Sequence, residues 1–259
     1  MATQSSIEGT GSGQDLGLIE RPGSFADRTD IPAVPGTNRL LMSLPAEELA
    51  VIAPRMELLS LENHAPLHQS GSPFEYAYFP QTGLISLVVV VNDGRSVEVG
   101  LIGKEGMVGA PVAAEVMSSP YGAIVQAPLT ALRIRADILD VLLPETPKLR
   151  ALLIRFAVFQ GMQVAQLAAC NRLHDIDQRL ARWLLMCQDR LGDSLLPMTH
   201  EFFAEMLGTG RPTVSVAAAV LQRAGFIQYS RGAVRIVDRS GLESAACECY
   251  RVIQQFTCC

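Results

Sequence analysis

The sequence predicts an α+β fold in three parts: an N-terminal antiparallel β-roll, a long helix, and a C-terminal helix-turn-helix followed by a two-stranded wing. Three observations lead to this prediction. Short apolar runs alternate with turn residues in the first half, apolar residues repeat at helical spacing from Leu149 onward, and Gly208 interrupts a helical pattern. With 49% hydrophobic residues and a net charge of −5, the chain can bury a core but is not expected to coat nucleic acid through charge alone.

The first 38 residues are rich in Gly, Ser, Pro and Thr and are expected to form a disordered arm. They lack the pattern of a signal peptide, and apolar runs such as Leu84–Val91 are too short to cross a bilayer. We therefore expect a cytoplasmic protein without a membrane partner. The expected domains are the arm at 1–38, the roll at 39–143, the long helix at 144–172, and the winged helix-turn-helix with its tail at 173–259.

The roll is predicted from apolar runs that are separated by turn signals. Pro80-Gln81-Thr82-Gly83 is expected to be a turn, and Asn92-Asp93-Gly94 a hairpin turn. Many short strands at this spacing are typical of a compact antiparallel barrel or roll. The expected strands are Met56–Leu61, Tyr76–Phe79, Leu84–Val91, Val97–Ile102, Ala123–Val125 and Ala131–Ile134.

The long helix is expected to start at Pro144 or Pro147 and to carry one wide apolar face. This face has two interpretations: it packs within its own domain, or it forms a dimer seam as in a coiled coil. A shorter helix is expected over Asp175–Leu191, and Gly192 ends it. The residues of the apolar face are Leu149, Leu152, Leu153, Phe156, Phe159, Met162 and Gln163.

The segment that begins at Thr199 carries the most specific motif. Thr199 is a good N-cap, and Gly208 can adopt the left-handed conformation that a sharp turn requires. A second helix then begins near Arg211. Small Ala204 suits the crossing point of the two helices, and Val214 is expected in their shared core. This spacing predicts a helix-turn-helix, with an ordinary helical hairpin as the alternative.

A two-stranded wing is predicted after the second helix. Such a wing favours a winged helix-turn-helix over an ordinary helical hairpin. Strand-like residues flank the turn Ser230-Arg231-Gly232. In a winged helix-turn-helix, the start of the second helix enters the major groove. Arg211 is therefore expected to contact guanine O6 and N7, whereas Arg223 is expected to face solvent.

Other residues around the motif are expected to contact the DNA backbone. Thr199 and His200 can bind phosphate through backbone N–H and side chain, and Arg231 can reach a phosphate from the wing. For His200 and Ser215, a solvated surface role is an equally good interpretation. The expected DNA-binding residues are Thr199, His200, Thr209, Arg211, Thr213, Ser215 and Arg231.

This order of elements resembles the Crp/Fnr family of regulators over about residues 40–250. The stretches Tyr78–Ser86 (YFPQTGLIS) and Val97–Gly109 (VEVGLIGKEGMVG) resemble the effector-domain roll of that family, and the helix-turn-helix is the most specific match. The resemblance implies a cyclic-nucleotide-binding-like jelly roll that senses an unidentified signal. Gly100, Gly103, Gly106 and Gly109 recur at every third position and are expected to form backbone turns in the roll; a small-molecule effector pocket nearby is the alternative, with Gly106, Gly109 and Tyr121 as its candidate residues.

The resemblance further implies a homodimer that is joined through the long helix and binds double-stranded DNA at a palindromic operator. The half-sites are then about 34 Å apart, and a signal in the roll shifts the population between two dimer states. RNA polymerase is an expected partner. The expected dimer interface is Leu149, Leu152, Phe156, Phe159 and Gln163.

The sequence departs from the ligand motifs of the family. Cyclic-AMP-binding members carry Gly-Glu and then Arg-Ser, whereas this chain has Gly109-Ala110 and Pro120–Ala123, so we expect no cyclic AMP binding. No cysteine precedes Cys170, which does not support an iron–sulfur cluster of the oxygen-sensing type. His64 and His68 are expected at the surface and do not support haem. Pro212 replaces a common Glu, so the operator is expected to differ from the best-known one.

The C-terminal cysteines do not indicate a metal site, and no catalytic motif indicates an enzyme. Cys247, Cys249, Cys258 and Cys259 match no standard zinc spacing, and no histidine is near them in sequence, so we expect unliganded thiols and no metal. No serine elbow or HExxH motif indicates an enzyme. The sequence predicts a DNA-binding transcription regulator; the alternative is a sensor and protein-interaction module whose helix-turn-helix no longer reads DNA.

Overall fold

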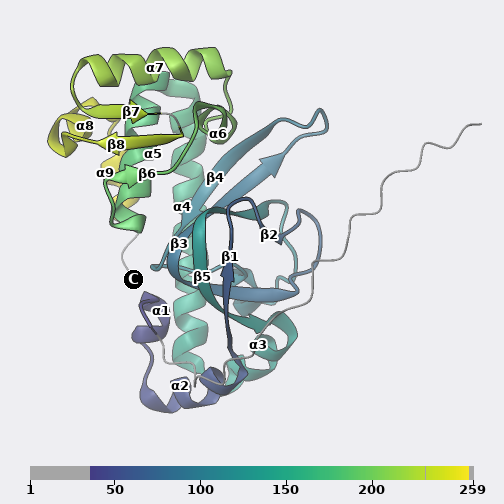
Figure 1. The fold of residues 1–259 in the computed structure, drawn as a ribbon. Coiled ribbons are helices and arrows are strands. Elements are labelled where there is room, and N and C mark those ends of the chain that lie inside the picture. Colours follow the sequence, from purple (N-terminus) through teal and green to yellow (C-terminus); the bar gives the residue numbers. More distant parts are fainter. Residues whose placement is uncertain (1–35, 231, 257–259) are drawn as a thin grey trace, which may run out of the picture. The chain divides into compact units, whose positions relative to one another are not determined.

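The computed structural model describes residues 36–230 and 232–256 (Figure 1). Most of the predicted N-terminal arm therefore lies outside the described residues. Its last residue is ordered: Asn38 is buried and its side chain accepts a hydrogen bond from the backbone N–H of Leu41, which caps the first helix. The structured chain thus begins slightly before the predicted boundary at residue 39.

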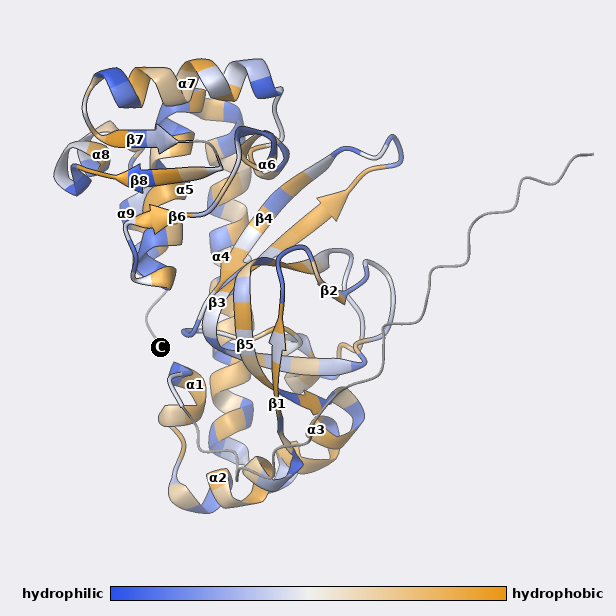
Figure 2. Ribbon diagram, viewed as in Figure 1, coloured by the Kyte–Doolittle hydropathy of each residue, from blue (hydrophilic) through white to orange (hydrophobic). Residues whose placement is uncertain are grey.

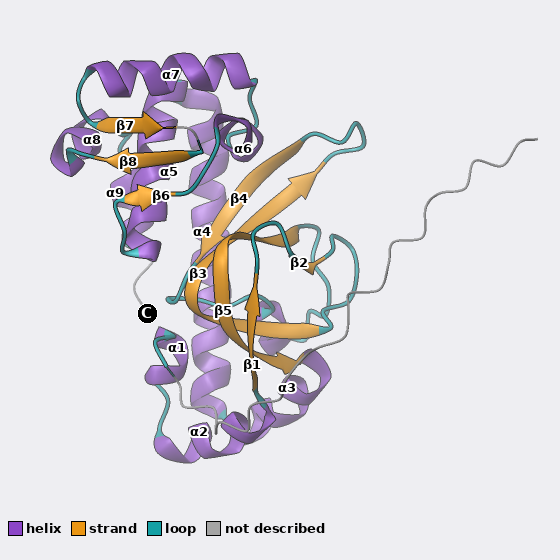
Figure 3. Cartoon of the chain, in the orientation of Figure 1, coloured by secondary structure: helices purple, strands orange, loops and turns teal. Residues whose placement is uncertain are grey.

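The β-roll comes first and is built around one antiparallel sheet. The strand order is β1-β5-β3-β4, and β2 pairs with β5. Figure 3 shows the strands of the roll together, with the short helices α2 and α3 at one end of them. The elements are α1 (Arg39–Met42), α2 (Ala46–Ile52), η1 (Ala53–Arg55), β1 (Glu57–Leu61), β2 (Pro66–His68), β3 (Tyr76–Val90), β4 (Ser96–Ile102), η2 (Ala110–Ala114), β5 (Gly122–Arg135), α3 (Ala136–Leu142) and η3 (Leu143–Glu145).

Strands β3 and β5 are longer than the sequence predicts, because each joins two of the predicted strands. The predicted turn at Pro80–Gly83 lies inside β3, where the register to β5 shifts and the chain bends without leaving the sheet. Gly83 has φ +84°, and a Cβ built on it would lie 2.3 Å from the Pro128 carbonyl oxygen. Glycine therefore permits both the bend and the close approach of β5. The predicted hairpin turn is confirmed, with Gly94 at φ +84°.

The long helix α4 (Pro147–Leu173) follows and packs its first half against the roll. Leu149 and Phe156 are buried in the same hydrophobic core as β3 and β5. The absent side chain of Gly106 makes room for Phe156, because a Cβ there would lie 2.3 Å from the ring. At the start of α4, both carboxylate oxygens of Glu48 accept hydrogen bonds from the backbone N–H groups of Lys148 and Leu149.

The winged domain forms the C-terminal part and has its own three-stranded sheet in the order β6-β8-β7. Its core is centred on Trp183 and Phe203, whose rings meet edge to face at 5.3 Å. Helix α5 starts with a capping box between Asp175 and Gln178. The elements are α5 (Ile176–Leu191), β6 (Leu195–Leu196), α6 (His200–Met206), α7 (Arg211–Arg223), β7 (Ile227–Ser230), β8 (Ala233–Ile236), α8 (Arg239–Ala245) and α9 (Cys249–Gln254).

The predicted dimer seam requires a correction. The side chains of Leu149, Leu152 and Phe156 are buried in the core of their own chain, and the Gln163 amide donates to the Phe256 carbonyl. Phe159 is half-buried and packs against the Phe256 ring at 5.8 Å. The larger apolar side chains of α4 therefore face inward, because they fill the gap between α4 and the roll.

The opposite face of α4 is exposed and shows a coiled-coil repeat. Its spacing alternates between three and four residues, which matches the a and d positions of a heptad. Helix α4 is also long and apolar enough to cross a membrane by length and composition, although its inward face already packs on the roll. The residues of this seam stripe are Ala151, Ile154, Val158, Gly161, Ala165 and Ala168.

Candidate DNA-binding site

The helix-turn-helix forms as the sequence predicts. The Thr199 hydroxyl accepts a hydrogen bond from the backbone N–H of Phe202 and caps α6. The chain then turns at Gly208, whose φ is +60°. The Thr209 N–H donates to the Ala204 carbonyl and closes this turn at 2.9 Å. Ala204 and Val214 are buried, at 5% and 0% exposure, as expected for the contact between the two helices.

Helix α7 leaves its N-terminus open to a ligand. Gly210 is its N-cap and offers no side chain to cap the first backbone N–H groups. Those N–H groups and the helix dipole favour an anion such as a DNA phosphate. The expected contact residues Arg211 and Thr213 are exposed at this end (Figure 2, which shows polar residues at both ends of α7). The local chain geometry therefore provides a helix end that favours an anion, with an exposed guanidinium beside it.

Among the described residues, Arg211 has one ion pair, and it is weak. Its Nη1 lies 3.4 Å from Glu201 Oε2, and the two side chains are 66% and 75% exposed. An ion pair this exposed contributes little free energy, so Arg211 can leave it to reach a base or a phosphate. Arg231 of the predicted wing tip lies outside the described residues, although β7 and β8 form the wing on either side of it.

His200 and Ser215 are brought together instead of pointing separately into solvent. His200 Nδ1 lies 3.1 Å from Ser215 Oγ, and the imidazole stacks on the Tyr229 ring at 3.9 Å. Burial lowers the pKa of His200, so the ring is neutral at neutral pH and supplies no positive charge for a phosphate. This geometry favours a structural link between α6, α7 and β7 for this pair.

Val216 is a further candidate contact residue that was not predicted from the sequence; it is 66% exposed on α7. It follows Pro212 by one helical turn, on the side away from the buried Val214 and Ala217. An exposed apolar side chain on this face suits contact with a thymine methyl group. The helical period could have identified it, because the buried positions of α7 leave Val216 on the outside.

The roll contacts the helix-turn-helix through the β3–β4 hairpin. Ser96 Oγ donates to Glu205 Oε1 at 2.9 Å, and a Cβ on Gly208 would lie 3.0 Å from Val97 Cγ2. A hollow between the hairpin and the motif is lined by both parts, including Arg95 and Arg211. The hairpin thus lies beside the turn that sets the direction of α7.

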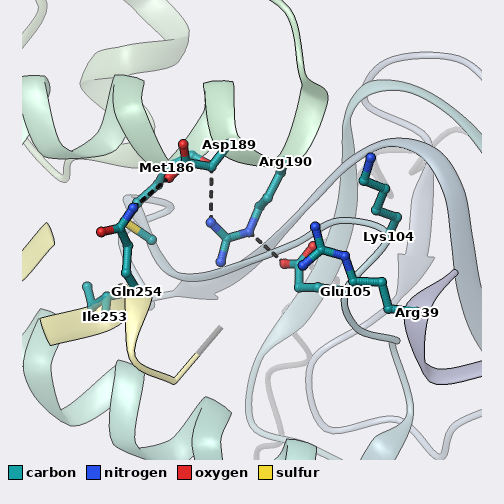
Figure 4. A pocket seen from close by; sticks show the side chains of 8 residues that line it. All are labelled: Arg39, Lys104, Glu105, Met186, Asp189, Arg190, Ile253 and Gln254. Carbon is teal, nitrogen blue, oxygen red and sulfur yellow. Dashed lines mark hydrogen bonds and ion pairs between the residues drawn. The ribbon is translucent and has the colours of Figure 1, made fainter. Parts of the chain in front are cut away.

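A second set of contacts joins the roll to α5. The Trp183 indole N–H donates to Glu98 at 2.8 Å, and Arg190 forms an ion pair with Glu105 at 2.7 Å. The side chains of Arg190 and Glu105 are only 3% and 6% exposed, so removal of one partner would leave a buried charge. Figure 4 shows this ion pair beside Lys104 and Asp189 at the wall of a pocket. The volume of this pocket is about 270 Å³.

The two glycines predicted beside an effector pocket pack closely against their neighbours. The space beside Gly106 is occupied by the Phe156 ring, and Gly109 packs against Ala77. Tyr121 directly precedes β5, and its carbonyl accepts a hydrogen bond from the Ser119 hydroxyl. The two glycines therefore serve close packing. His68, expected at the surface, is also buried at 8% exposure and stacks on Phe74.

Several solved structures share this fold. A protein from Eubacterium rectale, described as a transcriptional regulator of the Crp/Fnr family, is 18% identical with a TM-score of 0.64, over 80% of this chain and 97% of that chain. A CRP-family transcriptional regulator from Thermus thermophilus is 21% identical with a TM-score of 0.61, over 73% and 96%. FixK2 from Bradyrhizobium japonicum is 15% identical with a TM-score of 0.62, over 74% and 98%. No curated protein matches the sequence significantly.

Two family models match the sequence in the same order. The cyclic nucleotide-binding domain matches residues 58–145, and the Crp-like helix-turn-helix domain matches residues 178–245. The chain belongs to the Crp/Fnr family of transcription regulators. As a Crp/Fnr regulator it carries its DNA-binding domain at the C-terminus, and the predicted fold class, with a β-roll followed by a long helix and a winged helix-turn-helix, is confirmed.

The roll of this Crp/Fnr regulator does not fit a cyclic nucleotide phosphate. Between Gly109 and Ala123, Glu115 carries the one charged side chain; it is 83% exposed and lies 3.7 Å from Arg150. Helix η2 itself is apolar, with Ala110 and Val112 buried in the roll core. No residue between Gly109 and Ala123 is basic, so this segment offers a cyclic phosphate no positive partner of its own, which makes burial of the phosphate unfavourable.

Proposed function

We propose that this Crp/Fnr regulator acts in the cytoplasm as a homodimer that reads a palindromic operator with the N-terminal end of α7. One observation carries the proposal: α7 begins without a side-chain cap, next to an exposed and weakly held Arg211. That end can bind a phosphate through its N–H groups while the guanidinium reads guanine in the major groove. We expect no enzymatic activity.

The exposed stripe on α4 supports the homodimer. Ile154 and Val158 are 37% and 51% exposed although both are apolar, and a heptad repeat of this kind pairs with a second helix. The partner that fits best is the same helix of a second copy, because the repeat is then matched along its whole length. Two copies related by a twofold axis present two α7 helices to successive turns of one DNA face.

Control by a signal is expected to act through the contacts between roll and winged domain. The β3–β4 hairpin of the roll contacts α6, and Glu98 of the roll accepts a hydrogen bond from Trp183 on α5. A ligand in the roll that favours one arrangement of these contacts would shift the orientation of α7. The effector is expected not to be cyclic AMP, and RNA polymerase is an expected partner of the DNA-bound dimer.

The test is operator selection followed by an Arg211→Ala comparison. Duplexes selected from a random pool by the wild type are measured by fluorescence anisotropy, and R211A is expected to weaken binding by about 1–3 kcal/mol and relax one base position. Arg55→Ala is the control, because Arg55 is exposed on η1 in the roll. Equal affinity of R211A and wild type would contradict the proposal, and failure to select any sequence would favour a module that does not read DNA.

A further inference from the structure

Three cysteines and one histidine meet where the long helix joins the winged domain. Cys170 lies near the end of α4, and His174 is the residue that follows this helix as its C-cap. Cys247 and Cys249 come from the junction of α8 and α9, more than seventy residues later. The ligand atoms of all four side chains lie within 4.8 Å of one another. We propose that this Cys₃His cluster is a structural zinc site that fastens the end of α4 to the α8–α9 junction.

Two of the distances between these atoms are close to those expected around a single tetrahedral ion. With Zn–S and Zn–N distances of about 2.3 and 2.1 Å, tetrahedral ligands lie about 3.8 Å apart for two sulfurs and about 3.6 Å apart for sulfur and nitrogen. Here the Sγ atoms of Cys170 and Cys247 are 3.5 Å apart, and Cys249 Sγ is 3.6 Å from His174 Nδ1. The fold therefore places the ligands for one ion and leaves no open position for a substrate.

The neighbours of the cluster have the geometry that supports metal ligands. His174 Nε2 lies 3.1 Å from Glu248 Oε1, so the ring is oriented with Nδ1 toward the sulfurs. A carboxylate on the far nitrogen is the usual partner of a zinc-bound histidine. The Gln166 amide donates to Cys249 Sγ at 3.1 Å, which stabilises charge on that sulfur.

The chemistry of the ligands selects the metal. Three soft thiolates and one imidazole in a closed tetrahedron are a ligand set of structural zinc sites. The three cysteines are buried and form a hydrophobic cluster of their own, separate from the cores of the roll and winged domain. On binding, each thiol releases its proton to solvent and the sulfur donates a lone pair to the ion; no bond is oxidised or reduced.

The position of the site gives it a mechanical role. Helix α4 carries the proposed seam stripe, while α8 and α9 pack against α5 of the winged domain. An ion shared between Cys170 and Cys247 would couple the direction of α4 to that of the winged domain. This consequence rests on the proposed function, but metal binding itself does not, so the two can fail separately.

The first experiment measures zinc in the full chain. The reduced protein is stripped with a chelator, reloaded with zinc, desalted and analysed by plasma mass spectrometry, and we expect one zinc per chain. The variant C247S/C249S is expected to bind none, whereas C258S/C259S, which removes the two other C-terminal thiols, is expected to keep one. A wild type without zinc, or an unchanged zinc content in C247S/C249S, would overturn the proposal.

A second measurement does not depend on the folding of a ligand variant. Cobalt(II) added to the stripped wild type is expected to give intense visible bands of a tetrahedral site and a sulfur-to-cobalt charge-transfer band. X-ray absorption of the zinc form is expected to show three sulfurs and one nitrogen. Octahedral cobalt or a different set of ligands would overturn the proposal. A Cys170–Cys247 disulfide in protein that has been purified under reducing conditions would also overturn it.

Glu248→Gln tests the positioning of His174 without touching a ligand. Glu248 is 74% exposed, so the change leaves the core intact. We expect zinc affinity, measured by competition with a coloured chelator, to fall about 10–100-fold. Glu62→Gln, an exposed substitution in the roll, is the control and is expected to leave the affinity unchanged. Equal zinc affinities of E248Q and wild type would show that Glu248 does not position His174.

Discussion

Glu98→Gln is a sharp test of the contact between roll and winged domain, because Glu98 is buried there and its hydrogen bonds are to the uncharged side chains of Ser86 and Trp183. The carboxyl lies on β4, is 6% exposed, and accepts a hydrogen bond from the Trp183 indole. Ser86 Oγ lies 2.7 Å from Glu98 Oε2 and 2.6 Å from Gln126 Oε1. A hydroxyl has a single proton, so Ser86 can donate to only one of these two oxygens, and a protonated Glu98 that donates to Ser86 leaves that proton for Gln126.

The pKa of Glu98 gives the size of the effect. Burial raises this pKa from 4.5 to about 7, because its effect exceeds that of the hydrogen bonds with Ser86 and Trp183, which lower the pKa. The folded state then holds a proton that the unfolded state loses above 4.5, so the free energy of unfolding falls as pH rises through about 7. The full difference is about 3 kcal/mol, of which about 2 kcal/mol is lost between about pH 5.5 and pH 8.

The glutamine that replaces Glu98 would keep the hydrogen bonds and remove the titration. Its oxygen can accept from Trp183, and its amide can donate to Ser86, as the protonated acid does. Urea unfolding at fixed protein concentration, followed by circular dichroism, should show E98Q gaining about 2 kcal/mol over wild type between about pH 5.5 and pH 8. Glu62→Gln, exposed in the roll, should show no such change. A constant difference between E98Q and wild type at both pH values would refute a protonated Glu98.

Two further substitutions test the turn and the seam stripe. Gly208→Ala places a Cβ at φ +60° and 3.0 Å from Val97, so it should lower the free energy of unfolding by more than Gly192→Ala, where φ is +73° but nothing lies within 4 Å. The control should lose about 1 kcal/mol from the left-handed backbone alone, and equal losses in urea unfolding would count against the Val97 contact. Val158→Asp puts a carboxylate on the seam stripe and should weaken the dimer by about 3 kcal/mol in sedimentation equilibrium. Val141→Asp, an equally polar change at a 71% exposed position on α3, should leave the dimer intact, and a dimeric V158D would remove the stripe from the interface.

The parts of the site that were predicted correctly depend on neighbours in sequence. Thr199 caps α6, Gly208 adopts φ +60°, and α7 begins at Arg211, all through interactions that span a few residues. The pairing of His200 with Ser215 was not visible, because it joins two helices across fifteen positions. Val216 was missed for another reason: its exposure follows from the helical period, which had been applied only to the buried face of α7.

The errors elsewhere come from partners that lie far away in sequence. The apolar face of α4 was predicted from its period, but Gly106 opens the space that draws Phe156 into the roll and leaves Val158 outside. Pro80–Gly83 resembled a turn, yet β5 pairs with both sides of it and keeps β3 continuous. In both cases a local pattern had two possible structures, and a distant strand or loop selected one.

The amino-acid sequence alone determined the order of domains, the turn at Gly208 and the open start of α7, since caps, glycine turns and helical periods act within a few residues. Only the tertiary structure decided which face of α4 is free and that Cys170 and His174 meet Cys247 and Cys249. The physical reason is that burial and ligand geometry depend on residues far apart in the chain. Gly106 and Phe156 are fifty positions apart, and Cys170 and Cys247 are seventy-seven, so spacing along the sequence does not show that they meet.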